Sequence, residues 1–287
     1  MRCRKVYHIT ALASLAFGGC AATSQTNYTE QVPAYASVAQ RVVNAPAIVD
    51  LIVTRATPVE PERSGPLPVG VTRFYIEATV NSLIRGSTSV PPQLRFLADI
   101  QQDSRGRMAR PKGARYFAFG RISGDGTLQL SGQDALLPYG VQTDALVRSV
   151  TREAVAIDAP PAITGVDNAV HVPGNIPGEG ETQIFLSTAE QRPIAISILS
   201  RPGQERRWSV SLSEIVDEAA SAPTRDSLLW YRLACGGLPE RLPNSALSSS
   251  DAVNNGRARE DYQFVRRSIG TCTGRPPVSD APLIMNR

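Results

Sequence analysis

Residues 73–100, RFYIEATVNSLIRGSTSVPPQLRFLADI, decide the fold class. Apolar and polar side chains alternate over residues 74–80 and again over residues 94–100, and this period of two marks a strand with one buried face. Gly86 and the Pro91–Pro92 pair lie between the two runs, where glycine and proline interrupt regular structure. We therefore predict two neighbouring strands, each with one apolar face.

Strand-like patterns continue on both sides of this pair. Residues 47–54 form an aliphatic run, and residues 116–120 alternate again. The sequence Gly-Asp-Gly-Thr at 124–127 is typical of a hairpin turn, and two leucines at 128–130 continue on its far side. With a helix predicted over residues 35–43, these short strands favour a small barrel or a sandwich.

The order of these strands resembles that of netrin-like OB barrels. The resemblance rests on Ile84, Arg85 and Gly86 at the end of one strand, and on the later run GARYFAF at residues 113–119. It implies that residues 34–142 form a β-rich domain of the OB or netrin-like kind.

The second half of the chain has a mixed pattern. A helix is predicted over residues 143–157, with Thr143 as its N-cap and Pro160–Pro161 beyond its end. A strand is predicted over residues 162–172. Three further strands follow with the lengths and spacing of an antiparallel meander, at residues 181–188, 193–200 and 207–212. Helices are then predicted over residues 213–220 and 226–234 and along one last face, formed by Ala258, Tyr262, Val265 and Ile269.

These patterns predict an α+β protein with mainly antiparallel strands. The predicted organisation has five parts in chain order: a signal peptide (1–19), a lipid-anchored flexible tether (20–33), a β-rich barrel or sandwich domain (34–142), a helical connector (143–160) and an α+β domain with the meander (161–287).

The N-terminus carries the parts of a secretory signal. Arg2, Arg4 and Lys5 precede an apolar run at residues 9–17, which is too short to span a bilayer as a helix. The Gly-Gly-Cys sequence that follows resembles the lipobox of bacterial lipoproteins. That resemblance implies cleavage before Cys20 and attachment of acyl chains, palmitate included, to this residue.

The same resemblance bears on location. Ala21, rather than an aspartate, follows Cys20, which implies the periplasmic face of the outer membrane. Cleavage near Ala21–Ala22 is the alternative and would release a soluble periplasmic or secreted protein; a buried N-terminal helix with an incidental cysteine is another. Residues 178–234 also resemble uncharacterised predicted lipoproteins of alphaproteobacteria. This resemblance does not indicate any particular activity or site.

Composition narrows the class of partner. The 287 residues carry a formal charge of +4, and 42% of them are hydrophobic and 20% charged, which excludes a disordered chain. Arg2, Arg4 and Lys5 supply three of these charges, and no acidic residue precedes Cys20, so the rest of the chain is nearly neutral. The charge therefore offers no case for nucleic-acid binding.

The cysteines support export. Cys3 leaves with the signal and Cys20 is the proposed lipidation site, so Cys235 and Cys272 remain. In an exported protein these two are expected to form a disulfide. The bond would close a loop of 38 residues, counting both cysteines, and stabilise the fold by about 4 kcal/mol. Two separately buried thiols are the alternative.

The sequence contains few of the motifs that are typical of enzymes. We find no nucleophile elbow, phosphate-binding loop or Cys-x-x-Cys motif, and carboxylate pairs are too common to interpret. His171 is the one histidine beyond the signal; an Asp167–His171 pair is weighed against a structural role for this histidine. We therefore expect no catalytic residues, no cofactor and no metal.

A basic loop is the remaining candidate site. Arginine binds phosphate and carboxylate groups through its planar fork, so this loop is a candidate for binding anionic components of the envelope. The alternative is a solvated loop. The candidate residues are Arg105, Arg107, Arg110, Lys112 and Arg115.

Together these observations predict a lipid-anchored protein of the cell envelope with a non-catalytic binding or structural role. Its expected partners are the membrane, through the N-terminal lipid, and an envelope protein or anionic envelope component. Two alternatives stay open: a periplasmic hydrolase with a dispersed carboxylate or Ser/Asp site, and a soluble secreted binding protein.

Overall fold

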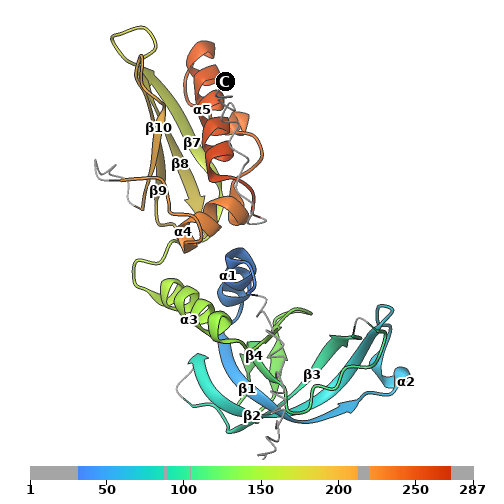
Figure 1. Ribbon diagram of the computed structural model, residues 1–287. Coiled ribbons are helices and arrows are strands. Elements are labelled where there is room, and N and C mark those ends of the chain that lie inside the picture. Colours follow the sequence, from blue (N-terminus) through green and yellow to red (C-terminus); the bar gives the residue numbers. More distant parts are fainter. Residues whose placement is uncertain (1–31, 87–88, 104, 213–219, 273–287) are drawn as a thin grey trace, which may run out of the picture. The chain divides into compact units, whose positions relative to one another are not determined.

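Two sheets of mainly antiparallel strands, with five α-helices, make up the part of the chain that the computed structural model describes (Figure 1). That part comprises residues 32–86, 89–103, 105–212 and 220–272. The predicted α+β class with mainly antiparallel strands is confirmed. The predicted signal peptide and most of the tether lie outside the described residues, and the domain boundaries stay predictions.

The first sheet contains six strands in the order β3-β2-β1-β4-β5, with β6 also paired to β4. The alternation predicted for residues 74–80 and 94–100 is confirmed, since Phe74, Ile76 and Phe96 are buried on one face while Tyr75 and Leu97 are exposed on the other. The strands are β1 (Ala47–Pro58), β2 (Val71–Arg85), β3 (Gln93–Gln101), β4 (Arg115–Ile122), β5 (Leu128–Leu130) and β6 (Leu136–Pro138).

This sheet is an open one that curls toward a barrel. Register shifts in the β1–β2 ladder, at Ile48, Asp50 and Val53, bend the sheet as β-bulges do. Its two outer strands meet at a single parallel bridge between Arg95 and Thr127. The small barrel expected for this half is therefore only partly closed, and the likeness to netrin-like barrels remains a resemblance.

Two helices pack on each other and on the outer face of this sheet: α1 (Tyr35–Asn44) and α3 (Val141–Val155). The helix predicted over residues 143–157 is present but shifted. Gly140 is its N-cap, so the prediction of Thr143 as the cap is wrong; Thr143 is buried in the first turn. Ile157 lies beyond its end and is 99% exposed, because the chain has already left the helix.

The second sheet contains the predicted three-strand meander, which β7 extends by a fourth strand, in the order β10-β9-β8-β7 with every pair antiparallel. Helix α5 (Ala252–Ile269) lies against one face of this sheet (Figure 1). The predicted apolar face of α5 is confirmed, because Ala258, Tyr262, Val265 and Ile269 are all buried. The strands are β7 (Ile163–Pro173), β8 (Gly180–Thr188), β9 (Ile194–Ser200) and β10 (Arg207–Ser211).

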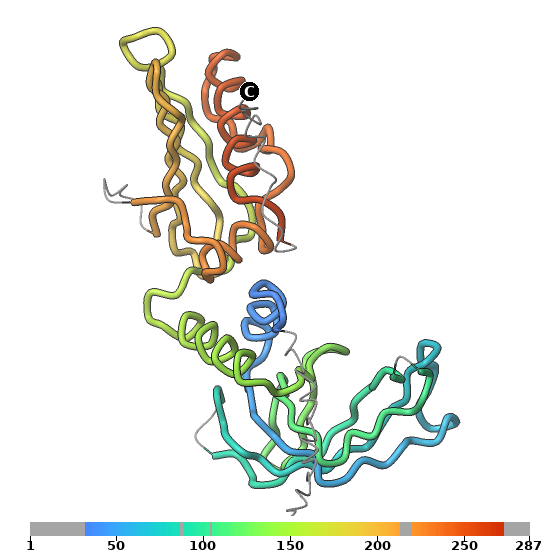
Figure 2. The backbone as a smooth tube through the Cα atoms, viewed as in Figure 1, coloured from blue at the N-terminus to red at the C-terminus, as the bar shows by residue number. Residues whose placement is uncertain are grey.

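Shorter helices connect these elements (Figure 2). The segment predicted as one helix over residues 226–234 is helix α4 (Leu228–Tyr231) followed by a π-helix (Arg232–Gly237). Gly237 lets this π-helix approach β7, since a Cβ there would lie 2.1 Å from the Ile163 carbonyl oxygen. The remaining short helices are α2 (Pro61–Ser64), in a stretch rich in loop-forming residues, and a 3-10 turn at Asn244–Ala246. Most of the helix predicted over 213–220 lies outside the described residues.

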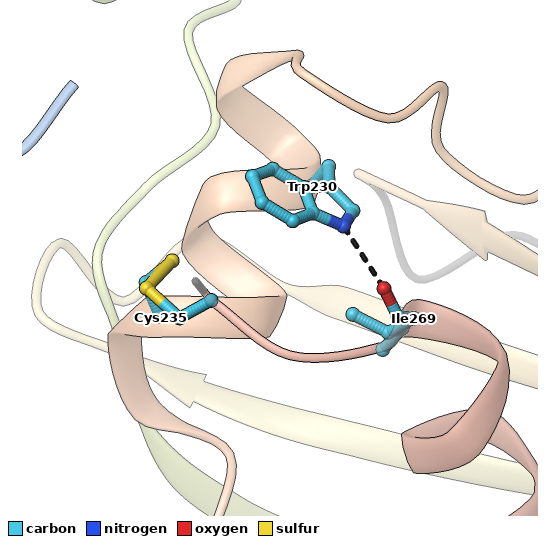
Figure 3. The surroundings of a disulfide bond; sticks show 4 residues. Trp230, Cys235 and Ile269 are labelled. Atoms are coloured by element: carbon cyan, nitrogen blue, oxygen red, sulfur yellow. Dashed lines mark hydrogen bonds between the residues drawn. A yellow bond between two sulfur atoms is a disulfide. The ribbon is translucent and has the colours of Figure 1, made fainter. Parts of the chain in front are cut away.

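The disulfide between Cys235 and Cys272 is present, with a Cα–Cα separation of 5.0 Å. It joins the π-helix to the chain that leaves α5 (Figure 3). Among the described residues, no helix has both the length and the apolar character needed to cross a membrane.

Candidate functional site

The basic loop does not act as one cluster. Arg115 lies on β4 and is paired with Asp50, and Arg107 forms an ion pair with Asp103 inside the loop. The three other cations are exposed and have no ion pair within the described part of the chain; they are Arg105, Arg110 and Lys112. Their proposed role in anion binding stays a prediction.

Asp50, which is buried, and Arg115, which is partly exposed, form an ion pair that the sequence did not reveal. Asp50 is fully buried on β1, and Arg115 donates to it twice, from Nε to Oδ1 at 2.8 Å and from Nη2 to Oδ2 at 2.6 Å. Asn81 donates a third hydrogen bond at 2.6 Å. The Arg115 guanidinium also lies 3.6 Å from the centre of the Tyr139 ring. Every polar atom of the carboxylate therefore has a charged or polar partner.

These contacts decide the charge state of Asp50. Burial acts to raise the pKa of this carboxyl, but the hydrogen bonds from Arg115 and Asn81, with the Arg115 charge, outweigh it and hold the pKa below its ordinary value. Arg148 on α3 hydrogen-bonds Ser82 of β2 and pairs with Asp144 on its own helix. The arrangement connects α3 to the sheet, and it leaves Asp50 ionised and out of reach of solvent.

A second polar cluster lies between the meander and α5. His171 does not pair with Asp167, as was weighed from the sequence; Asp167 is exposed. The Nδ1 of His171 lies 2.8 Å from the Thr182 hydroxyl, which itself donates to the buried carboxylate of Asp261. Arg206 pairs with the same carboxylate at 2.9 Å. Because Thr182 gives its proton to Asp261, it accepts from His171, so Nδ1 carries the ring proton.

An imidazole held in one tautomer by a carboxylate network is the arrangement used by general bases. Its free nitrogen, however, packs on backbone: a Cβ at Gly180 would lie 2.9 Å from Nε2. Burial lowers the pKa of His171, Asp261 opposes this, and the Arg257 and Arg206 charges lower it further. The cluster therefore holds a neutral histidine that connects β7, β8 and α5.

This histidine predicts how stability depends on pH. Because its pKa is lowered from 6.5 in the folded protein, the unfolded chain binds the proton first as the pH falls. We expect the free energy of unfolding to be highest above pH 6.5 and to decrease as the pH falls through 6.5 toward the folded pKa. Urea titrations at several pH values will measure this decrease.

His171→Gln is the matched variant, because its amide keeps polar atoms but does not titrate in this range. The slope between about pH 5 and 7 should flatten in the variant, since the shifted carboxyls titrate below their ordinary pKa of 3.8. An unchanged slope in His171→Gln would show that another group carries the pH dependence.

A cleft lies between β3 and β5, where the first sheet is open; we call it the edge cleft. It has a volume of about 790 Å³ and includes residues from both outer strands and the turns beside them. Tyr75 and Leu97 lie opposite each other on β2 and β3 at one wall, with 38% and 53% of their surface exposed. Phe96 and Leu128, on the barrel side, are buried.

The charges at this cleft are paired with one another. Arg73 binds Asp99 through two hydrogen bonds of 2.6 and 2.7 Å and also donates to the Ser64 carbonyl oxygen. The hydrogen bonds from Arg73 hold the pKa of Asp99 below its ordinary value against the opposing effect of burial. Arg95 lies 3.8 Å from Asp125. Arg73 and Arg95 are therefore already paired, and the edge cleft also presents apolar side chains and backbone.

The sequence does not reveal this cleft, because strand periodicity does not show whether two sheet edges meet. The one available signal was length, since the run at 128–130 is too short to cover its neighbour. No known family model matches the chain, and no curated protein matches it significantly. Within the described ranges, no three His, Cys, Asp or Glu side chains are grouped so that they would hold a metal ion.

Proposed function

We propose that the protein is a lipid-anchored, non-catalytic binding protein of the cell envelope. In this proposal Cys20 holds it at the periplasmic face of the outer membrane, and the edge cleft is its binding site. The observation that carries the binding role is the cleft itself, with about 790 Å³ of space beside the exposed Tyr75 and Leu97. Exposed apolar surface next to a cleft is typical of ligand and partner sites.

The charges favour binding over chemistry. The two buried aspartates, Asp50 and Asp261, are each held by an arginine at hydrogen-bond distance, and neither is among the residues of the edge cleft. A general acid or base must reach the proton that it transfers. The hydrolase alternative therefore receives no support from these two carboxylates.

The anchor rests on the Gly-Gly-Cys sequence that ends at Cys20. Acyl chains stabilise membrane attachment by about 0.8 kcal/mol for each buried methylene, so several chains together give stable anchoring. We expect cells to incorporate labelled palmitate into the protein and the protein to sediment with membranes. The change Cys20→Ala should abolish the label and move the protein to the soluble fraction.

Cys3→Ala is the matched control, because Cys3 lies within the proposed signal peptide. This variant should keep both the label and the membrane association. A label that survives in Cys20→Ala, or a wild-type protein without label, would refute the anchor. A soluble, unlabelled wild type that begins near Ala21–Ala22 would support the alternative of a secreted binding protein.

A further inference from the structure

Another cleft lies in the second half of the chain, between α5 and the loop at residues 239–244; we call it the helix cleft. It has a volume of about 680 Å³. Leu242 of this loop is buried in the hydrophobic core, while Arg241 before it is exposed. The helix cleft is separate from the edge cleft, because no residue lines both.

Hydrogen bonds from α5 hold the loop in place. The Tyr262 hydroxyl donates to the Pro239 carbonyl oxygen, and Gln263 donates from Nε2 to the Glu240 carbonyl oxygen at 2.9 Å. Tyr262 is itself fully buried, so the helix side of these contacts is rigid. The wall of the helix cleft is therefore formed before any ligand arrives, and binding does not have to order the loop.

Two arginines of the helix cleft have no acidic partner among the described residues. Arg241, on the loop, makes neither an ion pair nor a hydrogen bond there. Arg259, on α5, donates from Nη2 to the neutral side-chain oxygen of Asn244 at 3.0 Å. This bond orients the guanidinium but does not compensate its charge. Glu260, next to Arg259, is already paired with Arg257 at 3.0 Å.

A third arginine adds to the positive charge. Arg266 lies seven residues after Arg259 on α5, which is two turns or about 10 Å along the axis. Its charge opposes the rise that burial causes in the pKa of Tyr262, so it lies near the loop as well. Among the described residues that line the helix cleft, Glu240 alone is acidic. Three arginines against one glutamate leave two net positive charges within about one Debye length.

We propose that the helix cleft binds the phosphate group of a phosphate monoester, as a second ligand site that does not depend on the edge cleft. Arginine suits phosphate because its planar fork donates two hydrogen bonds at once. Arg241 comes from the loop and Arg259 from the helix. Donors on two different elements suit tetrahedral phosphate oxygens better than the planar oxygens of a carboxylate. A phosphate monoester carries about 1.5 to 2 negative charges at pH 7, which matches the two net positive charges.

The remaining surface indicates what carries the phosphate. The volume of about 680 Å³ is larger than a bare phosphate needs and is typical of sites for small organic molecules. The side-chain amides of Asn244 and Gln263 also line the helix cleft, and amides form hydrogen bonds with hydroxyl groups. The ligand is therefore a phosphate on a small polar group, a chemistry that soluble esters and lipid headgroups share.

The test measures binding of radiolabelled glycerol phosphate to the full-length protein in nonionic detergent, by equilibrium dialysis at low salt. Arg241→Gln should weaken binding about tenfold, because it removes charge-assisted hydrogen bonds. Arg259→Gln should have a similar effect. Arg267→Gln is the matched control, since Arg267 is exposed on the last turn of α5 but does not line the helix cleft; it should bind within about threefold of wild type. Circular dichroism should show an unchanged fold in all three variants.

Competing compounds separate the sources of the phosphate. A water-soluble phosphatidic acid with short acyl chains should displace the label more strongly than glycerol phosphate if a lipid headgroup is the source, and no more strongly if a soluble ester is. Succinate, a dicarboxylate of similar charge, should compete at least about tenfold more weakly than either. Succinate that competes equally, an Arg241→Gln variant that binds like wild type, or a wild type that retains no label would each overturn the phosphate site.

Discussion

Replacing Arg115 by methionine should lower the free energy of unfolding by about 3–5 kcal/mol, because it leaves a buried carboxylate without its counter-charge. Asp50 has no exposed surface, and only Asn81 and Ser82 would remain as its hydrogen-bond partners. Methionine keeps much of the side-chain volume over Tyr139, so the loss is mainly electrostatic. Urea unfolding at pH 7, followed by circular dichroism, measures the change.

Asp50→Asn, the matched change on the other partner, should lower the free energy of unfolding by less than Arg115→Met. Arg115 keeps 34% of its side-chain surface exposed, so in Asp50→Asn its charge can still be solvated. The pH gives an independent check. Wild-type Asp50 contributes stability above its ordinary pKa of 3.8 and loses it as the pH falls through the lowered folded pKa. In Arg115→Met, burial instead raises this pKa, so the variant's deficit should shrink as the pH falls below 7. A deficit that grows with acid, or an Asp50→Asn variant less stable than Arg115→Met, would contradict this account.

The pair also shows where sequence patterns stop being informative. Arg115 was grouped with the basic loop because it follows four other cations along the chain, yet its partner lies 65 residues away. Asp50 interrupts an aliphatic run and looks like an exception in a buried strand. A buried charge implies that a partner exists, but the run itself does not say which residue provides it.

Other features also divide into those that a single segment determines and those that depend on contacts between distant segments. The strands at residues 74–80 and 94–100 and the meander were predictable because a period of two reports local burial, which each segment carries by itself. The start of α3 was predicted wrongly, because Gly140 is the cap and Thr143 already lies within the helix. The His171 cluster depends on Asp261, which lies 79 residues from Thr182, and the edge cleft depends on how far two edges diverge. Both are set by tertiary packing.

The disulfide was predictable from the cysteine count, because the predicted signal peptide and lipidation site account for Cys3 and Cys20 and leave one pair. Its removal is the second change with a large expected effect. The double variant Cys235→Ala/Cys272→Ala should lower the free energy of unfolding of the C-terminal half, which contains the second sheet, by about 4 kcal/mol. The reason is that the unfolded chain is no longer closed into a loop. Both tryptophans, Trp208 and Trp230, belong to this half, so their fluorescence in urea follows its unfolding.

A contact near the disulfide shows whether removing the bond acts on the unfolded chain or on packing in the folded protein. The Trp230 indole N–H donates to the Ile269 carbonyl at 3.0 Å, one further contact between the helical segment and the end of α5 (Figure 3). If the disulfide acts mainly on the unfolded chain, this contact survives in the double variant and native fluorescence stays unchanged while the urea midpoint falls. Reduced wild type and Cys235→Ser/Cys272→Ser should then lose similar stability, because the loop closure is the same whatever replaces the sulfur. A loss below about 1 kcal/mol, or a native spectrum that changes with the substituting residue, would show that local packing rather than chain constraint decides the stability of this end of the fold.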